Sequence, residues 1–141
     1  MQTRDQKLAL AVYNRVQSFD KPTLSDAQRK QYGSMAHKLP ILIRTAGLSQ
    51  ALAFIEARHR QQKPEAPLPP QLHLLRDLEH VLRENGMLSG TNLFATARIA
   101  DLGEYMRLTQ HTLAALLWFK RYAQSVLGVE QGEYEEERSH E

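Results

Sequence analysis

Residues 32–58 read YGSMAHKLPILIRTAGLSQALAFIEAR, and this stretch decides the fold that we expect. It predicts a helix bent at Pro40, a break around Gly47 and then a second helix, because proline bends a helix and glycine is typical of helix ends. At about 100° per residue, the first helix gathers an apolar stripe that predicts a core contact. The stripe consists of Tyr32, Met35, Leu39, Leu42, Ile43 and Ala46.

The other side of this helix is basic. It carries Lys30, Gly33, Ser34, His37, Ile41 and Arg44, with Lys38 at its edge. No Asp or Glu occurs in residues 28–53, whereas a solvated helix face usually mixes both signs. A surface that binds phosphates has no use for carboxylates. The pattern therefore favours a nucleic-acid contact, but a solvated helix whose charges happen to be basic explains it equally well.

Two residues on this basic side are neither charged nor polar. Gly33 leaves a low spot that another backbone can approach closely. Ile41 is apolar among polar neighbours, which predicts that a partner surface covers it.

Helical periodicity recurs along the rest of the chain, and no segment with strand-like alternation outweighs it. We expect an all-α, single-domain bundle of about six helices over residues 1–128, followed by an acidic, disordered tail over residues 129–141. Thr3 with Gln6, and Ser25 with Gln28, predict capping boxes at the first two helices. The remaining helices are predicted over residues 71–84, 93–102 and 104–127, with Gly103 either at a break between the last two or at a tight contact.

The charge is unevenly distributed along the 141 residues. Residues 1–128 hold 17 Lys and Arg against 10 Asp and Glu, a net charge of +7, whereas residues 129–141 hold one Arg and six Glu, a net charge of −5. A basic body suggests a polyanionic partner. The chain has no cysteine, which excludes disulfides and thiolate metal sites. No apolar run approaches the length that spans a membrane.

Motifs for catalysis and metal binding are scarce. No phosphate-cradling glycine loop and no nucleophile elbow occurs. His73, Asp77 and His80 stand at i, i+4 and i+7, a spacing that places three metal ligands on one helix face. The same three residues fit an exposed polar helix face equally well. Because no fourth ligand is evident, we predict neither a metal nor a cofactor. His37, His59 and His111 are candidate general bases for RNA cleavage, but each stands alone, so we predict no catalytic residue.

Trp118 lies on the last predicted helix, beside Arg121 and Arg107. Three interpretations stay open. The indole lies at the rim of the core with its N–H in water, or it contacts another protein chain, or it stacks on a nucleobase.

Parts of the central stretch also resemble a known family. Four segments resemble the signature of the small α-helical subunit of type III-B CRISPR effector (Cmr) complexes. They are Tyr32-Gly33, residues 38–45 (KLPILIRT), Gly47-Leu48 and residues 50–54 (QALAF). Ala46 stands where that family commonly has Asn. Tyr105, Thr109, Leu113 and residues 118–123 (WFKRYA) are similar to the family's C-terminal helix, and the resemblance covers most of residues 4–128.

The resemblance implies a non-catalytic, cytoplasmic subunit of an RNA-guided antiviral complex. In such complexes, copies of the small subunit stack into a short filament beside the one that holds the guide RNA, and other subunits cut nucleic acid. The implied partners are the other Cmr subunits, further copies of this chain and the duplex of crRNA with target RNA. No membrane and no small-molecule substrate is implied.

Base pairing with the guide supplies sequence specificity in such a complex, so this subunit needs only backbone contacts. We expect Lys38 and Arg44 to make them first, because both match the motif and lie on or beside the basic side. Lys30, Lys120 and Arg121 come next, and Ile41 and Trp118 are the candidates for subunit contacts. Two alternatives stay open: a protein–protein adaptor whose basic side meets an acidic partner, and a histidine-dependent ribonuclease.

Overall fold

The computed structural model describes residues 1–61 and 63–131 of the chain. These residues form helices and connecting loops without a strand, which confirms the all-α prediction. The expected disorder of residues 132–141 lies outside the described residues. The helices are α1 (Arg4–Phe19), α2 (Asp26–Ala46), α3 (Leu48–Arg58), α4 (Pro70–Glu84), α5 (Leu93–Ile99) and α6 (Leu102–Ser125). None of the described helices combines the length and the apolar content that a membrane crossing requires.

Both predicted capping boxes are present. Thr3 Oγ1 accepts from the backbone N–H of Gln6 at 3.1 Å, and the Gln6 side chain accepts from the Thr3 N–H at 2.8 Å. Ser25 and Gln28 form the same reciprocal pair at the start of α2. Each pair satisfies two backbone donors that a helix leaves without an intrahelical partner, which is why these short motifs fix where α1 and α2 begin.

Helix α2 continues through Pro40, as expected from the unbroken phase of its apolar stripe. It ends at Gly47, whose φ of +89° is unfavourable for other residues. The first N–H groups of a helix lack partners within the helix, and the backbone N–H of Ser49 in α3 donates to the hydroxyl of Tyr105 on α6 at 3.0 Å. Gly47 therefore separates two helices, and Tyr105 fixes the corner between them.

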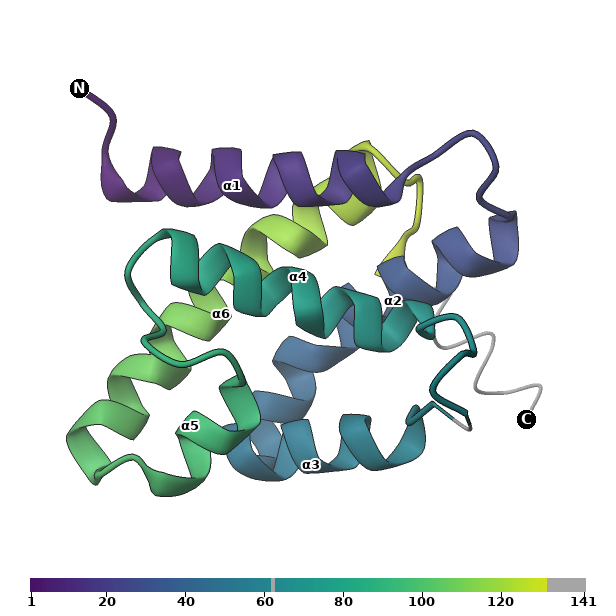
Figure 1. Cartoon of the computed structure of the whole chain (residues 1–141). Helices are drawn as coiled ribbons and strands as arrows, with labels where there is room; N and C mark the ends of the chain where they lie inside the picture. Colours follow the sequence, from purple (N-terminus) through teal and green to yellow (C-terminus); the bar gives the residue numbers. More distant parts are fainter. Residues whose placement is uncertain (62, 132–141) are drawn as a thin grey trace.

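The helices pack in a compact crossing arrangement (Figure 1). Helix α1 lies along α4 and α6, and α2 packs against α6, α4 and α3. The short helices α3 and α5 contact each other at one end of the molecule. After α6 the chain turns back and runs beside α2. Most of the predicted stripe on α2 is buried, including Tyr32, which stacks on Phe19 of α1 with ring centroids 4.0 Å apart, whereas Ala46 at the end of the helix is exposed.

The predicted break at Gly103 is wrong. Helix α5 ends at Ile99, and the chain breaks at Ala100 before α6 begins at Leu102. The side chain of Asp101 accepts from the N–H of Glu104 at 2.9 Å and so starts the helix upstream of the glycine. Gly103 lies exposed within the first turn of α6, where it interrupts nothing.

A buried carboxylate joins three helices near the middle of the bundle. Asp77 on α4 is 1% exposed. Its Oδ1 accepts from the Nε and Nη2 of Arg15 on α1 at 3.0 and 2.9 Å, and its Oδ2 accepts from the hydroxyl of Tyr32 on α2 at 2.7 Å. Burial, and then the charge of Asp77, raises the pKa of the Tyr32 hydroxyl well above its usual value, so this hydroxyl stays protonated and donates.

This carboxylate corrects the interpretation of His73, Asp77 and His80 as one exposed polar face. Asp77 points into the bundle because Arg15 and Tyr32 satisfy its oxygens there, whereas His80 is exposed and lies 3.8 Å from Glu84. Among the described residues, no group of three or more His, Asp or Glu is placed to hold a metal ion.

A second charged network ties α3, α4 and α5 together. Arg76 on α4 donates to Glu56 on α3 and to Glu79 on its own helix, each at 2.7 Å. The other oxygen of Glu79 accepts from the backbone N–H of Leu93 at 2.6 Å, in the first turn of α5. A carboxylate is well placed at a helix N-terminus, where backbone N–H groups lack partners. Glu79 therefore holds the first turn of α5, which Asn92 caps, against α4.

We expect Asp77→Ala to lower the free energy of unfolding by about 3 kcal/mol, because it leaves Arg15 and Tyr32 without their buried partner. This value lies at the lower end of the destabilisation expected for breaking a buried ion pair, because the Arg15 side chain is 32% exposed and regains water contacts. Urea unfolding followed by circular dichroism measures this change. Tyr32→Phe removes one hydrogen bond only and should cost about 1 kcal/mol. An Asp77→Ala variant as stable as Tyr32→Phe would contradict the assignment of Asp77 as the joining group.

Candidate nucleic-acid interface

Helix α2 presents only part of its basic side to solvent. The expectation that Gly33, Ser34 and His37 lie on an outer face is wrong, because all three are buried. The chain after α6 covers them. Val129 sits directly on Gly33, so that a Cβ placed on this glycine would lie 2.6 Å from the Cβ of Val129. The low spot predicted at Gly33 is real, but the chain itself occupies it.

The covering segment is held by directed contacts. Gly128, with φ at +70°, follows the last turn of α6 and lets the chain reverse. The backbone N–H of Val129 donates to the carbonyl of Ala123 at 2.8 Å. The carbonyl of Val129 accepts from Nε2 of His37 at 2.9 Å, and His37 is 2% exposed. Val129, which we assigned to the acidic tail, is therefore part of the buried core.

Lys38 and Arg44 do not form one continuous ridge. They lie six residues apart, which turns them about 120° away from each other around α2. Lys38 is half-buried and faces α3, with its Nζ 5.4 Å from the ring centroid of Phe54. Arg44 is exposed, and Lys30 is half-buried nearer the start of the helix. Arg29, the fourth basic residue of α2, pairs with Asp20 and Asp26. The structure thus leaves Lys30, Lys38 and Arg44 at separate positions along the helix.

Lys120, Arg121 and Trp118 belong to α6. Lys120 is half-buried and Arg121 is exposed. The guanidinium of Arg121 lies 4.8 Å from the centroid of the Trp118 ring, which also stacks on Tyr122. The indole N–H donates to Asp5 Oδ1 on α1 at 3.1 Å rather than to water. Trp118 therefore has several partners within its own chain.

Several apolar side chains of α2, α5 and α6 are exposed. Ile41, the subunit-contact candidate on α2, is largely exposed, as predicted from its place among polar residues. Ile99 at the end of α5 and Leu102 and Met106 on α6 are more exposed still, with Leu102 at 75%. Sequence reasoning missed this group because the expected break at Gly103 concealed that Leu102 and Met106 share one helix face. Exposed apolar side chains that cluster are typical of protein contacts.

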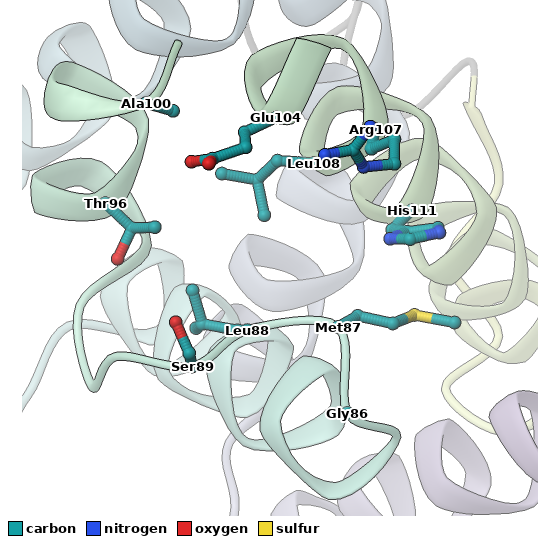
Figure 2. A pocket seen from close by; sticks show the side chains of 10 residues that line it. All are labelled: Gly86, Met87, Leu88, Ser89, Thr96, Ala100, Glu104, Arg107, Leu108 and His111. Atoms are coloured by element: carbon teal, nitrogen blue, oxygen red, sulfur yellow. The ribbon is translucent and has the colours of Figure 1, made fainter.

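A cleft of about 280 Å³ opens between α5, α6 and the loop after α4. Figure 2 shows Arg107 and His111 projecting from α6 on one side, with Met87, Leu88 and Ser89 on the other. Arg4 on α1 donates from Nη2 to Nε2 of His111 at 2.7 Å, which requires the imidazole to be neutral at that nitrogen. Burial, then Arg4 and Arg107, lowers the pKa of His111 below its usual value.

The three candidate general bases stay separate. His37 is bound to a backbone carbonyl, and His111 lies among cations. The pKa of His59 is also lowered, first by burial and then by Arg58 and Lys38. Among the described residues, no carboxylate forms an ion pair with any of these three histidines. This arrangement gives no paired acid and base for cutting RNA.

The described residues thus form a small all-α fold with separated cations and exposed apolar side chains on its surface. The family model described as CRISPR-associated protein (Cas_Cmr5) matches residues 4–126. The chain therefore belongs to the Cmr5 family of type III-B CRISPR systems, and the resemblance found in its motifs is confirmed.

Two comparisons with individual proteins agree. The chain is 40% identical over 127 residues to a Thermus thermophilus protein named CRISPR system Cmr subunit Cmr5, and the match covers 90% of this chain and 98% of that protein. The fold is similar to the crystal structure of a CRISPR-associated Cmr5 family protein from the same organism. That match has a TM-score of 0.69 and 39% identity, and it covers 89% of this chain and 98% of the other.

We expect Gly33→Ala to destabilise the protein by about 1–2 kcal/mol, because the new methyl group overlaps Val129 and forces the covering segment away from α2. Chemical unfolding at constant m-value measures the change. In a Val129→Gly background, the effect of Gly33→Ala on stability should reverse sign and become a gain of up to about 1 kcal/mol. Once the clash is gone, alanine stabilises the helix more than glycine does. An equal loss in both backgrounds would show that Val129 is not the obstacle.

Acidification should destabilise the folded chain partly through His111. Because the folded pKa lies below the unfolded value of about 6.5, the stability that His111 contributes is present above this pH and is lost as the pH falls through the lowered folded pKa. Melting temperatures measured at about pH 7.5 and pH 5 should therefore differ less in His111→Gln than in the parent chain. His80→Gln, at an exposed position outside the cleft, is the control. Identical pH dependence in His111→Gln and the parent chain would contradict this role.

Proposed function

We propose that this chain is a non-catalytic small subunit of a type III-B (Cmr) CRISPR effector complex. Copies of it stack beside the other Cmr subunits, and its basic side chains contact the backbone of the duplex formed by crRNA and target RNA. Membership of the Cmr5 family is the observation that carries the proposal. In this role the protein acts in the cytoplasm, needs no cofactor and has no small-molecule substrate.

The surface of α2 supports the nucleic-acid part of the proposal. Arg44 is exposed and Lys30 is half-buried, and no described carboxylate forms an ion pair with either of them. Lys38 stands at the α2–α3 corner. Cations at such intervals suit repeated contacts to phosphates, which need no reading of bases when the guide supplies specificity. Lys120 and Arg121 add two cations on α6.

The exposed apolar side chains support the assembly part. Ile41, Leu102 and Met106 are far more exposed than core residues of similar size, and a partner subunit that covered them would remove apolar area from water. Trp118 is the weaker candidate for this contact, because Asp5, Arg121 and Tyr122 already surround much of its ring.

Combining Lys38→Ala with Arg44→Ala should weaken binding of target RNA to the assembled complex and lower its salt dependence. Each lost phosphate contact reduces the magnitude of the slope of log K against log salt by about 0.7 to 0.9. For the double variant, the magnitude of this slope should therefore fall by about 1.5 over the range from about 50 to 200 mM salt. Filter binding over this range measures the slope. Lys7→Ala with Lys21→Ala removes the same charge at exposed positions outside α2 and serves as the control.

Two outcomes would contradict the proposal. An unchanged slope in the Lys38 and Arg44 variant would remove these residues from the RNA contact. Failure of the chain to co-purify with a crRNA-containing Cmr assembly would remove the assembly role, and binding of an acidic protein instead would favour the adaptor function.

A further inference from the structure

Three basic residues of α2 stand in a row along the helix. Lys30, His37 and Arg44 follow one another at intervals of seven residues, so they leave the helix axis within about 40° of each other and about 10 Å apart along it. We call them the α2 row. Lys30 is half-buried and Arg44 is exposed, and no carboxylate in the described part of the chain forms an ion pair with either of them.

The chain that follows α6 reaches the α2 row at its middle. The carbonyl of Val129 accepts from Nε2 of His37 at 2.9 Å, and the backbone N–H of Val129 donates to the carbonyl of Ala123 at 2.8 Å. Val129 is therefore held from both α2 and α6. The residues after it start from a fixed point between Lys30 and Arg44.

The residues that come next are strongly acidic. Residues 132–141, which lie outside the described residues, hold five Glu and one Arg, a net charge of −4. We call them the acidic segment. An extended chain covers about 3.3 Å per residue, so four residues beyond Val129 span about 13 Å, which is enough to reach Lys30 or Arg44. A connection this short gives the two charged groups an effective concentration in the millimolar range.

We propose that the acidic segment of each chain binds Lys30 and Arg44 of its own α2 row and competes there with the RNA backbone. This inference rests on the proposed function, in which these two cations contact phosphates, and it adds a regulator of that contact. A run of carboxylates offers cations the same negative charge that a phosphate backbone offers. Exposed ion pairs are individually weak, so a longer array of phosphates displaces the segment.

Other cations of the molecule fit this role less well. Arg15, Arg29 and Arg76 are already paired with carboxylates of the helical body. The cleft that contains Arg107 lies between α5 and α6, away from the point where the described chain ends beside α2 (Figure 1). The α2 row thus combines cations that lack a described carboxylate with the anchor of the acidic segment.

A first experiment tests the contact in the free, full-length chain. A carbodiimide couples a carboxylate to a lysine amine that it touches, and Arg44→Lys supplies a second amine in the α2 row. Mass spectrometry should find both amines of the row coupled to glutamates of residues 132–141. Mixing unlabelled with isotope-labelled chains should show that the coupling occurs within one chain. Lys7, which is exposed on α1, is the control and should couple far less.

A second experiment tests the competition. The full-length chain that combines Glu135→Gln, Glu136→Gln and Glu137→Gln keeps its length but loses three negative charges. Its affinity for an RNA duplex of about twenty base pairs should rise about fivefold at about 50 mM salt, because an occupied site lowers the apparent affinity. The gain should fall below about twofold at about 200 mM salt, which screens exposed ion pairs.

Two comparisons separate a contact at the α2 row from a general repulsion of RNA. Changing Glu65, Glu84 and Glu104 to Gln alters the net charge equally at exposed positions elsewhere, and should change the affinity by less than about twofold. In a background that carries Lys30→Ala and Arg44→Ala, the substitutions in the acidic segment should lose most of their effect. A general repulsion would persist in this background, whereas a direct contact is lost.

Either experiment can overturn the proposal. Absence of coupling to the α2 row, or coupling mainly between chains, would remove the contact. An unchanged affinity of the Glu→Gln chain, or an equal gain with the control set or in the Lys30 and Arg44 background, would remove the competition. Coupling within a chain that binds no RNA and joins no crRNA-containing assembly would instead count against the proposed function, so the two failures are distinguishable.

Discussion

A single buried carboxylate holds the arrangement of the longer helices. Asp77 accepts hydrogen bonds from Arg15 of α1 and Tyr32 of α2, which lie 62 and 45 residues away in sequence, so three helices meet at one charged group. A buried charge is costly unless its lone pairs are satisfied, and both oxygens of Asp77 have donors. Apolar packing alone tolerates sliding of one helix past another, whereas directed bonds to two partners fix the relative positions of α1, α2 and α4.

The position of α2 determines which side chains a partner can reach. Its inner side packs on α4 and α6, and part of its remaining surface is closed by the segment around Val129. Arg44 and Ile41 stay exposed, and Lys38 is directed toward Phe54 on α3. The basic side that looks continuous on a helical wheel is thus divided into a covered part, a solvent-facing part and a part shared with the next helix.

This division explains what could and could not be predicted from the sequence. The helix starts at Thr3 and Ser25 depend on residues three positions apart, so local patterns predicted them. The burial of His37 depends on a residue 92 positions away, and the burial of Asp77 depends on Arg15 and Tyr32, which lie 62 and 45 positions away. A helical wheel contains none of these distant partners. The identity of the family came from a motif, whose residues are close together in the sequence.

The cover over α2 also has a consequence for how the molecule is made. Val129 is synthesised long after Gly33 and His37, and closing so large a loop is slow and entropically costly. During translation the hollow at Gly33 therefore cannot be closed before Val129 has been made. A polypeptide that ended before Val129 would lack the cover over Gly33 and the acceptor for His37, so that it would present a different α2 surface.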